Sequence, residues 1–373
     1  MDEGAESLLP VAMSPKRPWQ LPKLPKLEFF GTPKFIAAVT LAWMVILLIY
    51  LFRVSLGAVL HTTTTDNAQF SLQNLISSTP PPSVKNTLIS YVYSESHESL
   101  QNLLFFLDHG LHAQADFLFI FNGPTNHTEL IPNKPNIRYV QRDNTCYDLG
   151  AHAEVLTKDD LWLRYRRFVL MNASVRGPFM PHWADACWSE RLLSKVTKDV
   201  KLVGLSLNCW PTPHVQSMVW ATDSSGMSLL LYPPKRSPRH DGWMEVLFAH
   251  PAQFPRPANY KQDDPEWFEP GLNKCFENRQ QAVEAEIAAT GIMFGADKKV
   301  DVMLMKFQTD PDYNAHCSRL GAWDPQANGA YDGVNIHPFE TMFIKTNRGI
   351  DPRLLALQTG WMDRSRFSSY DYC

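Results

Sequence analysis

A polar break follows an apolar segment at residues 168–183, FVLMNASVRGPFMPHW. The apolar residues up to Met171 predict a buried strand, and Asn172, Ser174 and Arg176 follow it directly. Sheets of the α/β class present ligand-binding groups at the carboxyl ends of their strands, so we expect these side chains to face a ligand. The guanidinium of Arg176 would suit a phosphate group. Asn and Ser are also common turn residues, so an ordinary strand end is the alternative.

A second polar segment, CYDLGAHAEVL at residues 146–156, lies where a strand is expected to pass into a helix. Asp148 can accept hydrogen bonds from a ribose or another sugar, or it can simply cap the helix. Tyr147 can stack on a nucleobase, although a core aromatic residue is equally expected at this position. The segment therefore predicts a nucleoside contact, with a structural role as the alternative for each residue.

Three further groups supply titratable side chains. His214 can bind phosphate, ligate a metal or act as a base, and a structural histidine is the alternative. Glu284 and Glu286 lie two apart on a predicted helix, so only one of them can face a cleft. Glu286 lies between a small and an apolar residue, and we expect it to be half-buried with a raised pKa, as a general base requires. Lys345 can reach a diphosphate.

Two asparagines stand in N-glycosylation sequons. Asn126, followed by His and Thr, lies just past a predicted strand and is the expected acceptor. Asn172 also begins a sequon, but we expect it to be buried and unmodified.

Strand and helix patterns alternate from residue 86 onward, which predicts a mainly parallel sheet covered by helices on both faces. Period-2 or continuous apolar runs predict strands at 86–94, 115–123, 136–143, 165–174, 200–209 and 300–307. Apolar residues at helical spacing predict helices at 99–111, 146–156, 188–196 and 280–294.

An uncharged apolar stretch at residues 35–52 is long enough to cross a bilayer as a helix. Basic residues are concentrated in residues 1–34, so this tail should be cytosolic and the rest of the chain lumenal, as in a type II membrane protein. Residues 53–84, rich in Thr, Ser and Pro, then serve as a spacer. Residues 85–373 form the folded domain.

Six cysteines all follow the apolar stretch, which predicts one to three disulfides in an oxidising compartment; free buried thiols are the alternative. Their pairing cannot be read from the sequence. A net charge of -3 disfavours a nucleic-acid partner. The chain has no GxxxxGK[ST], GxSxG, HExxH or GxGxxG motif, which disfavours P-loop enzymes, α/β-hydrolases, common zinc peptidases and ordinary dinucleotide binders.

Together these segments resemble known enzymes. CYDLGAHAEVL (146–156) and RFVLMNASVRGPF (167–179), with LVGLSLNC and HVQSM after them, are similar to segments of rhamnan-synthesis F-like glycosyltransferases and their fungal and algal membrane-bound relatives. A tail, one anchor, a spacer and one α/β domain likewise resemble a Golgi glycosyltransferase of the GT-A, Rossmann-like kind. The resemblance spans roughly residues 86–348.

The resemblance implies a type II enzyme of the Golgi or ER membrane that transfers a sugar from a nucleotide-diphosphate sugar to a glycan or glycoconjugate. Asp148 would contact the nucleoside, Glu286 or Glu284 would act as base, and Asn172 and Ser174 would occupy the place of a metal-binding Asp-x-Asp motif. These two side chains are neutral, whereas Mn²⁺ or Mg²⁺ prefers carboxylates. The alternatives are therefore metal held by other groups, a diphosphate neutralised by Arg176, His214 and Lys345, or an inactive carbohydrate-binding protein or scaffold on the same fold.

Overall fold

The computed structural model describes residues 85–233, 271–308, 313–320 and 323–373, all within one compact unit, Thr79–Cys373. The predicted tail, anchor and spacer, at 1–34, 35–52 and 53–84, lie outside the described residues. Within the described part of the chain, no helix combines the length and the apolar character needed to cross a bilayer.

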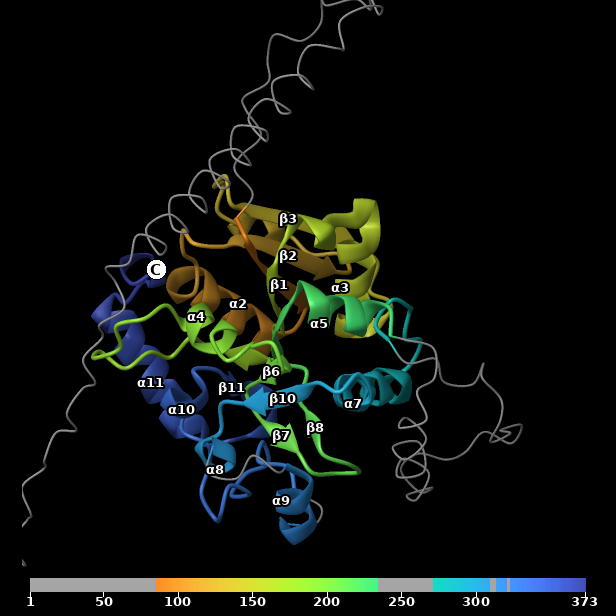
Figure 1. Cartoon of the computed structure of the whole chain (residues 1–373). Helices are drawn as coiled ribbons and strands as arrows, with labels where there is room; N and C mark the ends of the chain where they lie inside the picture. Colours follow the sequence, from red (N-terminus) through yellow and green to blue (C-terminus); the bar gives the residue numbers. More distant parts are fainter. Residues whose placement is uncertain (1–84, 234–270, 309–312, 321–322) are drawn as a thin grey trace, which may run out of the picture. The chain divides into compact units, whose positions relative to one another are not determined.

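A seven-stranded sheet in the order β10-β6-β9-β4-β1-β2-β3 organises the domain (Figure 1). Neighbouring strands are parallel, except that β9 runs antiparallel to both β4 and β6. The prediction of a mainly parallel α/β sheet is confirmed. The strands are β1 (Thr87–Ser94), β2 (Asp116–Asn122), β3 (Ile137–Arg142), β4 (Arg167–Asn172), β6 (Val200–Gly204), β9 (Val219–Asp223) and β10 (Lys299–Val302).

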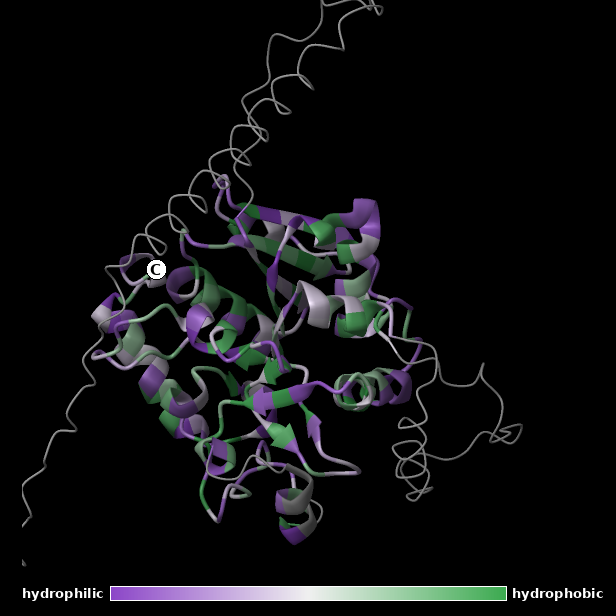
Figure 2. Cartoon of the chain, in the orientation of Figure 1, coloured by the Kyte–Doolittle hydropathy of each residue, from purple (hydrophilic) through white to green (hydrophobic). Residues whose placement is uncertain are grey.

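Both faces of the sheet are buried, which is why its strands read as nearly continuous apolar runs. On β1, Leu88 and Val92 point to one face, and Ile89 and Tyr91 point to the other. Figure 2 shows hydrophobic residues through much of the sheet. The first face packs against α3 (Tyr147–Thr157), α5 (Ser224–Leu231) and α7 (Arg279–Gly295), and the second packs against α2 (His97–His109) and α4 (Trp188–Leu193).

The C-terminal part of the chain adds shorter elements around this sheet. The helices are α8 (Met305–Gln308), α9 (Tyr313–Leu320), α10 (Pro338–Thr341) and α11 (Pro352–Ser365). Two small antiparallel pairs lie outside the large sheet: β5 (Val175–Arg176) with β11 (Ile344–Lys345), and β7 (Leu207–Asn208) with β8 (His214–Val215).

The strand predicted at 300–307 is too long. It ends at Val302, and α8 begins three residues later. The strand predicted at 200–209 is likewise interrupted, because β6 ends at Gly204 and β7 belongs to a separate sheet.

Gly177 allows β11 to approach the end of β5. Its φ of +153° is a conformation that side chains disfavour, and a Cβ atom there would lie 2.4 Å from the Met342 carbonyl oxygen. The chain can therefore turn sharply after β5 and still hold β11 against it.

All six cysteines are paired, as Cys146–Cys275, Cys187–Cys373 and Cys209–Cys317. This confirms the expected disulfides at the upper end of the predicted number. Each bridge joins residues more than a hundred positions apart in the sequence.

The chain leaves the described structure after Pro233 and re-enters it at Gly271. The amide of Leu272 donates a hydrogen bond of 2.7 Å to the carbonyl of Leu230, so the two sides of this gap meet. A Cβ atom on Gly271 would lie 2.8 Å from Pro233 Cδ, which shows how close the two sides are.

Candidate functional site

The turn after β4 is held by the side-chain amide of Asn172. Asn172 Oδ1 accepts hydrogen bonds from the Ser174 amide (3.1 Å) and the Ser174 hydroxyl (2.6 Å). Asn172 Nδ2 donates to Asp148 Oδ2. The two polar segments singled out in the sequence therefore meet at the carboxyl end of β4, on the face of the sheet that α3 covers.

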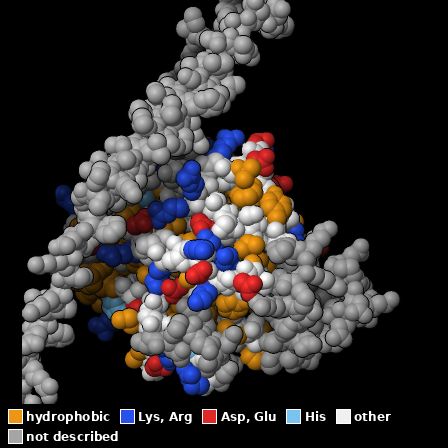
Figure 3. All heavy atoms as spheres, in the orientation of Figure 1, with side chains coloured by type: hydrophobic (Ala, Val, Ile, Leu, Met, Phe, Trp, Pro, Cys, Tyr) orange, Lys and Arg blue, Asp and Glu red, His pale blue; other side chains and the backbone are white. Residues whose placement is uncertain are grey.

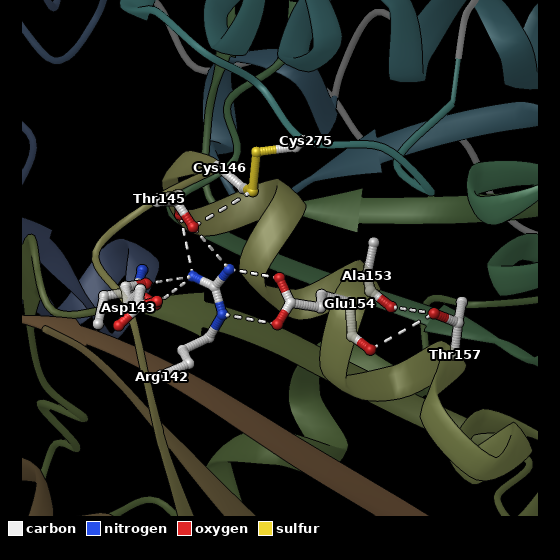
Figure 4. A network of polar contacts seen from close by, with 9 residues as sticks. Arg142, Asp143, Thr145, Cys146, Ala153, Glu154, Thr157 and Cys275 are labelled. Carbon is white, nitrogen blue, oxygen red and sulfur yellow. Dashed lines mark hydrogen bonds and ion pairs between the residues drawn. A yellow bond between two sulfur atoms is a disulfide. The ribbon is translucent and has the colours of Figure 1, made fainter.

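Asp148 lies in the first turn of α3, whose start is strongly constrained. Cys146 and Tyr147 both have positive φ angles, and the Cys146–Cys275 disulfide fixes this point of the chain (Figure 4). Arg142 at the end of β3 forms an ion pair with Glu154 on α3 (Figure 4). The disulfide holds the amino end of α3 and the ion pair holds its second half, so the helix that carries Asp148 is fixed at two points.

Burial raises the pKa of the Asp148 carboxyl above its ordinary value. The hydrogen bond from Asn172 opposes this shift, the negative charge of Glu286 reinforces it, and the positive charge of Lys345 opposes it. Asp148, Glu286 and Lys345 thus interact electrostatically, although they come from α3, α7 and β11.

Glu286 forms a second polar cluster with His214 and Ser217. Glu286 Oε2 accepts hydrogen bonds from the Ser217 amide (2.9 Å) and hydroxyl, and Oε1 lies 3.5 Å from His214 Nε2. Burial disfavours the ionised carboxylate, but the hydrogen bond and charge of His214, the charge of Lys345 and the Ser217 hydroxyl bring the pKa of Glu286 down to about 2. The expectation of a raised pKa was wrong, because the sequence does not reveal these donors.

Lys345 stands beside the Asn172 turn because β11 pairs with β5, in the register Lys345 opposite Val175. The amide of Thr346 donates to the Ser174 carbonyl (3.0 Å) and extends this pairing. No hydrogen bond or ion pair joins Lys345 Nζ to another described residue. Its ammonium group is therefore available to a ligand.

The cluster is accessible from solvent. Asn172 and Ser174 are half-buried, whereas the residues on either side of each are buried. Glu286 likewise lies between buried Ala285 and Ile287, and its side chain is 22% exposed. Of the remaining members, Asp148, Ser217 and Lys345 are also half-buried, and His214 is buried.

Two predicted site residues do not join this cluster. Arg176 donates from Nε to Asn102 Oδ1 (3.0 Å) and from Nη1 to Thr359 Oγ1 (3.3 Å), and burial lowers its pKa. Glu284 is buried, and its pKa is raised by burial. Glu284 Oε1 accepts a hydrogen bond from Gln280, one turn earlier on α7 (3.0 Å). The expectation that only one of the two glutamates faces the site is consistent with this arrangement.

Two predicted surface residues are exposed. Tyr147 is 41% exposed beside Asp148, which leaves its ring free to stack on a ligand. Asn126 is exposed at the start of a short 3₁₀ turn, so it can accept a glycan. Both roles stay predictions.

The oxygen atoms of Glu286 and Asn172 are poorly placed to coordinate a divalent cation. Both oxygens of Glu286 and the amide oxygen of Asn172 already contact protein groups, and Lys345 adds a positive charge nearby. Among the described residues, one group of three His, Cys, Asp or Glu ligands is close enough to share an ion, namely His112, Cys187 and Cys373. There the two sulfurs form a disulfide with each other.

Sequence reasoning missed two residues that support the site. Asn102 on α2 and Thr346 after β11 contact the turn that carries Ser174. No local pattern marks either residue, because their partners are distant in sequence. The one available signal is an Asn in the middle of an apolar helix, where it is a poor helix former.

Comparison with known proteins gives distant structural similarity to glycosyltransferases. No protein-family model matches the chain, and neither does any curated protein. The chain is similar to the glycosyltransferase GlyE of Streptococcus pneumoniae TIGR4, with 8% identity, a TM-score of 0.34, and coverage of 77% of this chain and 65% of GlyE. The apo form of GlyE gives 7% identity and a TM-score of 0.33, with coverage of 74% and 64%.

A third solved structure is the mannosyltransferase PcManGT from Pyrobaculum calidifontis in complex with GDP-Man and Mn²⁺. It is 13% identical, with a TM-score of 0.26, and the match covers 70% of this chain and 83% of PcManGT. The chain thus spans slightly less than two thirds of the length of GlyE. The α/β fold class rests on the sheet described above.

Proposed function

We propose that the chain is a glycosyltransferase that moves a sugar from a nucleotide-diphosphate sugar to a glycan or glycoconjugate acceptor. The observation that carries this proposal is the meeting of Asp148, Asn172 and Ser174 at the carboxyl end of β4, with Lys345 beside them. These residues include the polar positions of the two segments that resemble glycosyltransferases. The carboxyl edge of a parallel sheet is also where α/β folds bind their ligands.

The charges of the site suit the reaction. Transfer breaks the bond between the anomeric carbon and a diphosphate oxygen, and the electron pair leaves with the diphosphate. Lys345 supplies a positive charge to this leaving group. Glu286, ionised at neutral pH, supplies a negative charge that can stabilise the cationic anomeric carbon.

The new bond forms from an acceptor hydroxyl, whose proton must pass to a base. Asp148 suits this role better than Glu286, because its pKa is shifted upward, toward the range in which a carboxylate exchanges protons efficiently. This assignment moves the role of base from Glu286, where the sequence resemblance placed it, to Asp148, which was expected to contact the nucleoside. Tyr147 remains the proposed contact for the nucleobase.

The proposed mechanism uses no divalent cation; Lys345 offsets part of the negative charge of the diphosphate. We further propose that residues 35–52 anchor the chain in the membrane as a single type II helix and that the domain after it lies in the lumen. The three disulfides support an oxidising compartment, such as the Golgi or ER lumen. On the face drawn in Figure 3, Lys and Arg lie among Asp and Glu. The net charge of -3 favours a small-molecule or glycan ligand over a nucleic acid.

The test is release of nucleoside diphosphate by the purified chain from a panel of nucleotide-diphosphate sugars, in EDTA and in Mn²⁺. We expect turnover in EDTA, and we expect Lys345→Gln to weaken nucleoside diphosphate binding roughly 10- to 100-fold. Lys299→Gln is the matched control. Exposed Lys299 begins β10, so it lies at the amino end of the strands, whereas the site lies at the carboxyl end of β4. Its binding should equal that of the wild type.

Three results would contradict parts of this proposal. Turnover that requires Mn²⁺ would refute the metal-free site. A wild-type chain that neither binds nor hydrolyses any nucleotide-diphosphate sugar would refute the enzyme. Glycan binding without nucleotide binding would instead favour the inactive carbohydrate-binding protein.

A further inference from the structure

We propose that Asn102 is a positioning residue that fixes the Ser174 turn against β11 and so sets the place of Lys345 before any ligand binds. Asn102 lies in the middle of α2, on the sheet face opposite α3, and its side chain is fully buried. Its side chain therefore cannot contact a substrate directly. The inference rests on the proposed function for its effect on ligand binding.

The side-chain amide of Asn102 uses both of its donor hydrogens on the site. Asn102 Nδ2 donates to the Ala173 carbonyl (2.8 Å) and to Thr346 Oγ1 (2.9 Å). Ala173 lies between Asn172 and Ser174, and Thr346 follows Lys345. One buried amide group therefore ties both halves of the site together.

Thr346 closes a ring of hydrogen bonds around the same point. Its amide and its hydroxyl both donate to the Ser174 carbonyl, at 3.0 and 3.3 Å. Because the Thr346 hydroxyl accepts from Asn102 and donates to Ser174, the three residues hold one another in a single arrangement. The pairing of β11 with β5 is only two residues long, so these bonds supply much of its constraint.

Arg176 fixes the orientation of the Asn102 amide. A guanidinium has only donors, so the Asn102 atom that faces Arg176 Nε at 3.0 Å must be the oxygen Oδ1. Both Asn102 N–H groups then point toward Ala173 and Thr346. Arg176 is in turn held by Thr359 on α11. Arg176 thus supports the Ser174 turn through Asn102, and the phosphate contact expected from the sequence stays a prediction.

The test compares Asn102→Asp with Asn136→Asp. The first change keeps the shape of the side chain but replaces both donors by a carboxylate, which repels the Ala173 carbonyl. Asn136 is a matched control, because its Nδ2 donates to the carbonyls of His112 (3.0 Å) and Ala115 (2.8 Å) at the amino edge of the sheet. The readouts are amide hydrogen exchange of the full chain and the dissociation constant for UDP and GDP.

We expect Asn102→Asp to speed exchange of the Thr346 amide at least tenfold and to weaken nucleoside diphosphate binding roughly tenfold. Asn136→Asp should change exchange near β2 and β3 and leave binding unaltered, even where it lowers the melting temperature equally. Unchanged Thr346 exchange in Asn102→Asp, or equal loss of binding in both variants, overturns the inference.

A failure of the proposed function is distinguishable from a failure of this inference. If the wild-type chain binds neither nucleotide, the proposed function fails, whereas the Thr346 exchange rate still decides the role of Asn102. If Asn102→Asp does not fold, Thr346→Val removes one of its partners at a half-buried position. The same direction of change in exchange and binding is then expected, and no change contradicts the inference.

Discussion

Glu286 is held in its ionised form by the side chains that surround it. His214 and Ser217 stabilise the carboxylate, and together with Lys345 they outweigh the cost of burial. A carboxylate with a lowered pKa stabilises the folded state while it is ionised. Protonation of this group should therefore matter for stability as well as for catalysis.

We predict that Glu286→Gln destabilises the fold by about 3 kcal/mol at pH 7, from the shift between an ordinary glutamate pKa and about 2. The stability that Glu286 contributes is fully present above its unfolded pKa and is lost as the pH falls through the folded one. The wild type and the variant should therefore converge between about pH 5 and pH 2. Urea denaturation across this range measures the difference.

Glu284→Gln is the control for this experiment, because burial raises the Glu284 pKa and reverses the sign. Unlike Glu286→Gln, Glu284→Gln should show no destabilisation at pH 7 that vanishes when the pH is lowered. A Glu286→Gln difference that stays constant from pH 7 to pH 2 would contradict the assigned ionisation.

At this scale, the sequence predicted the positions better than the chemistry. The sequence singled out Asp148, Asn172 and Ser174, which contact one another in the structure, because strand ends and helix starts have local signatures. The pKa of Glu286 was not predicted, because His214 and Ser217 are distant in sequence and act only through the fold. The hydrogen bond from Arg176 to Asn102 on α2 was not foreseen for the same reason.

At the scale of elements, α3 carries Asp148 and packs closely on the segment that contains Cys275. Gly150 makes this approach possible. A Cβ atom there would lie 2.8 Å from Cys146 Cβ and 3.0 Å from the Lys274 carbonyl oxygen, and neither neighbour can move easily beside a disulfide. The position of α3 thus depends on one missing side chain.

We predict that Gly150→Ala destabilises the domain by about 1–3 kcal/mol, because the added methyl group overpacks this contact. Gly360→Ala on α11 is the matched substitution, since the nearest atom to its Cβ would be the flexible Arg364 guanidinium at 3.2 Å. Gly360→Ala should stabilise by about 0.5–1 kcal/mol, as expected inside a helix. Guanidinium denaturation midpoints measure both changes, and a stabilising Gly150→Ala would disprove the close packing.

The sequence predicted the elements around the parallel strands well and missed those that break the alternation. β9 was not recognised, because it is only five residues long, VWATD, and directly follows a polar, Pro-containing segment. The helices α5 and α11 were also missed. Each is short or only weakly apolar along its length, so its packing partners decide its structure.

At the scale of the whole molecule, disulfides connect parts of the chain that are far apart in sequence. Cys187–Cys373 joins the loop before α4 to the last residue described, across a separation of 186 residues. Sequence could predict that bridges form but not which ones, because pairing depends on tertiary distances. Long closed loops also restrict the unfolded chain most.

We predict that Cys187→Ser and Cys373→Ser each destabilise the domain by about 2–5 kcal/mol. The double variant should be destabilised no more than the less stable single variant, because both single variants and the double variant lack the same Cys187–Cys373 bridge. Denaturation curves without reductant, with thiol counting under unfolding conditions, provide the measurement. Any free thiol in the unfolded wild type would contradict complete pairing.

The hydrogen bond between Leu272 and Leu230 has a consequence for insertions into this chain. Because this hydrogen bond already holds the two described sides of the gap together, doubling the length of chain between them should cost only about 0.6 kcal/mol in closure entropy. An insertion at this place should therefore leave the register of the sheet unchanged. The same place is a natural graft point for a reporter domain.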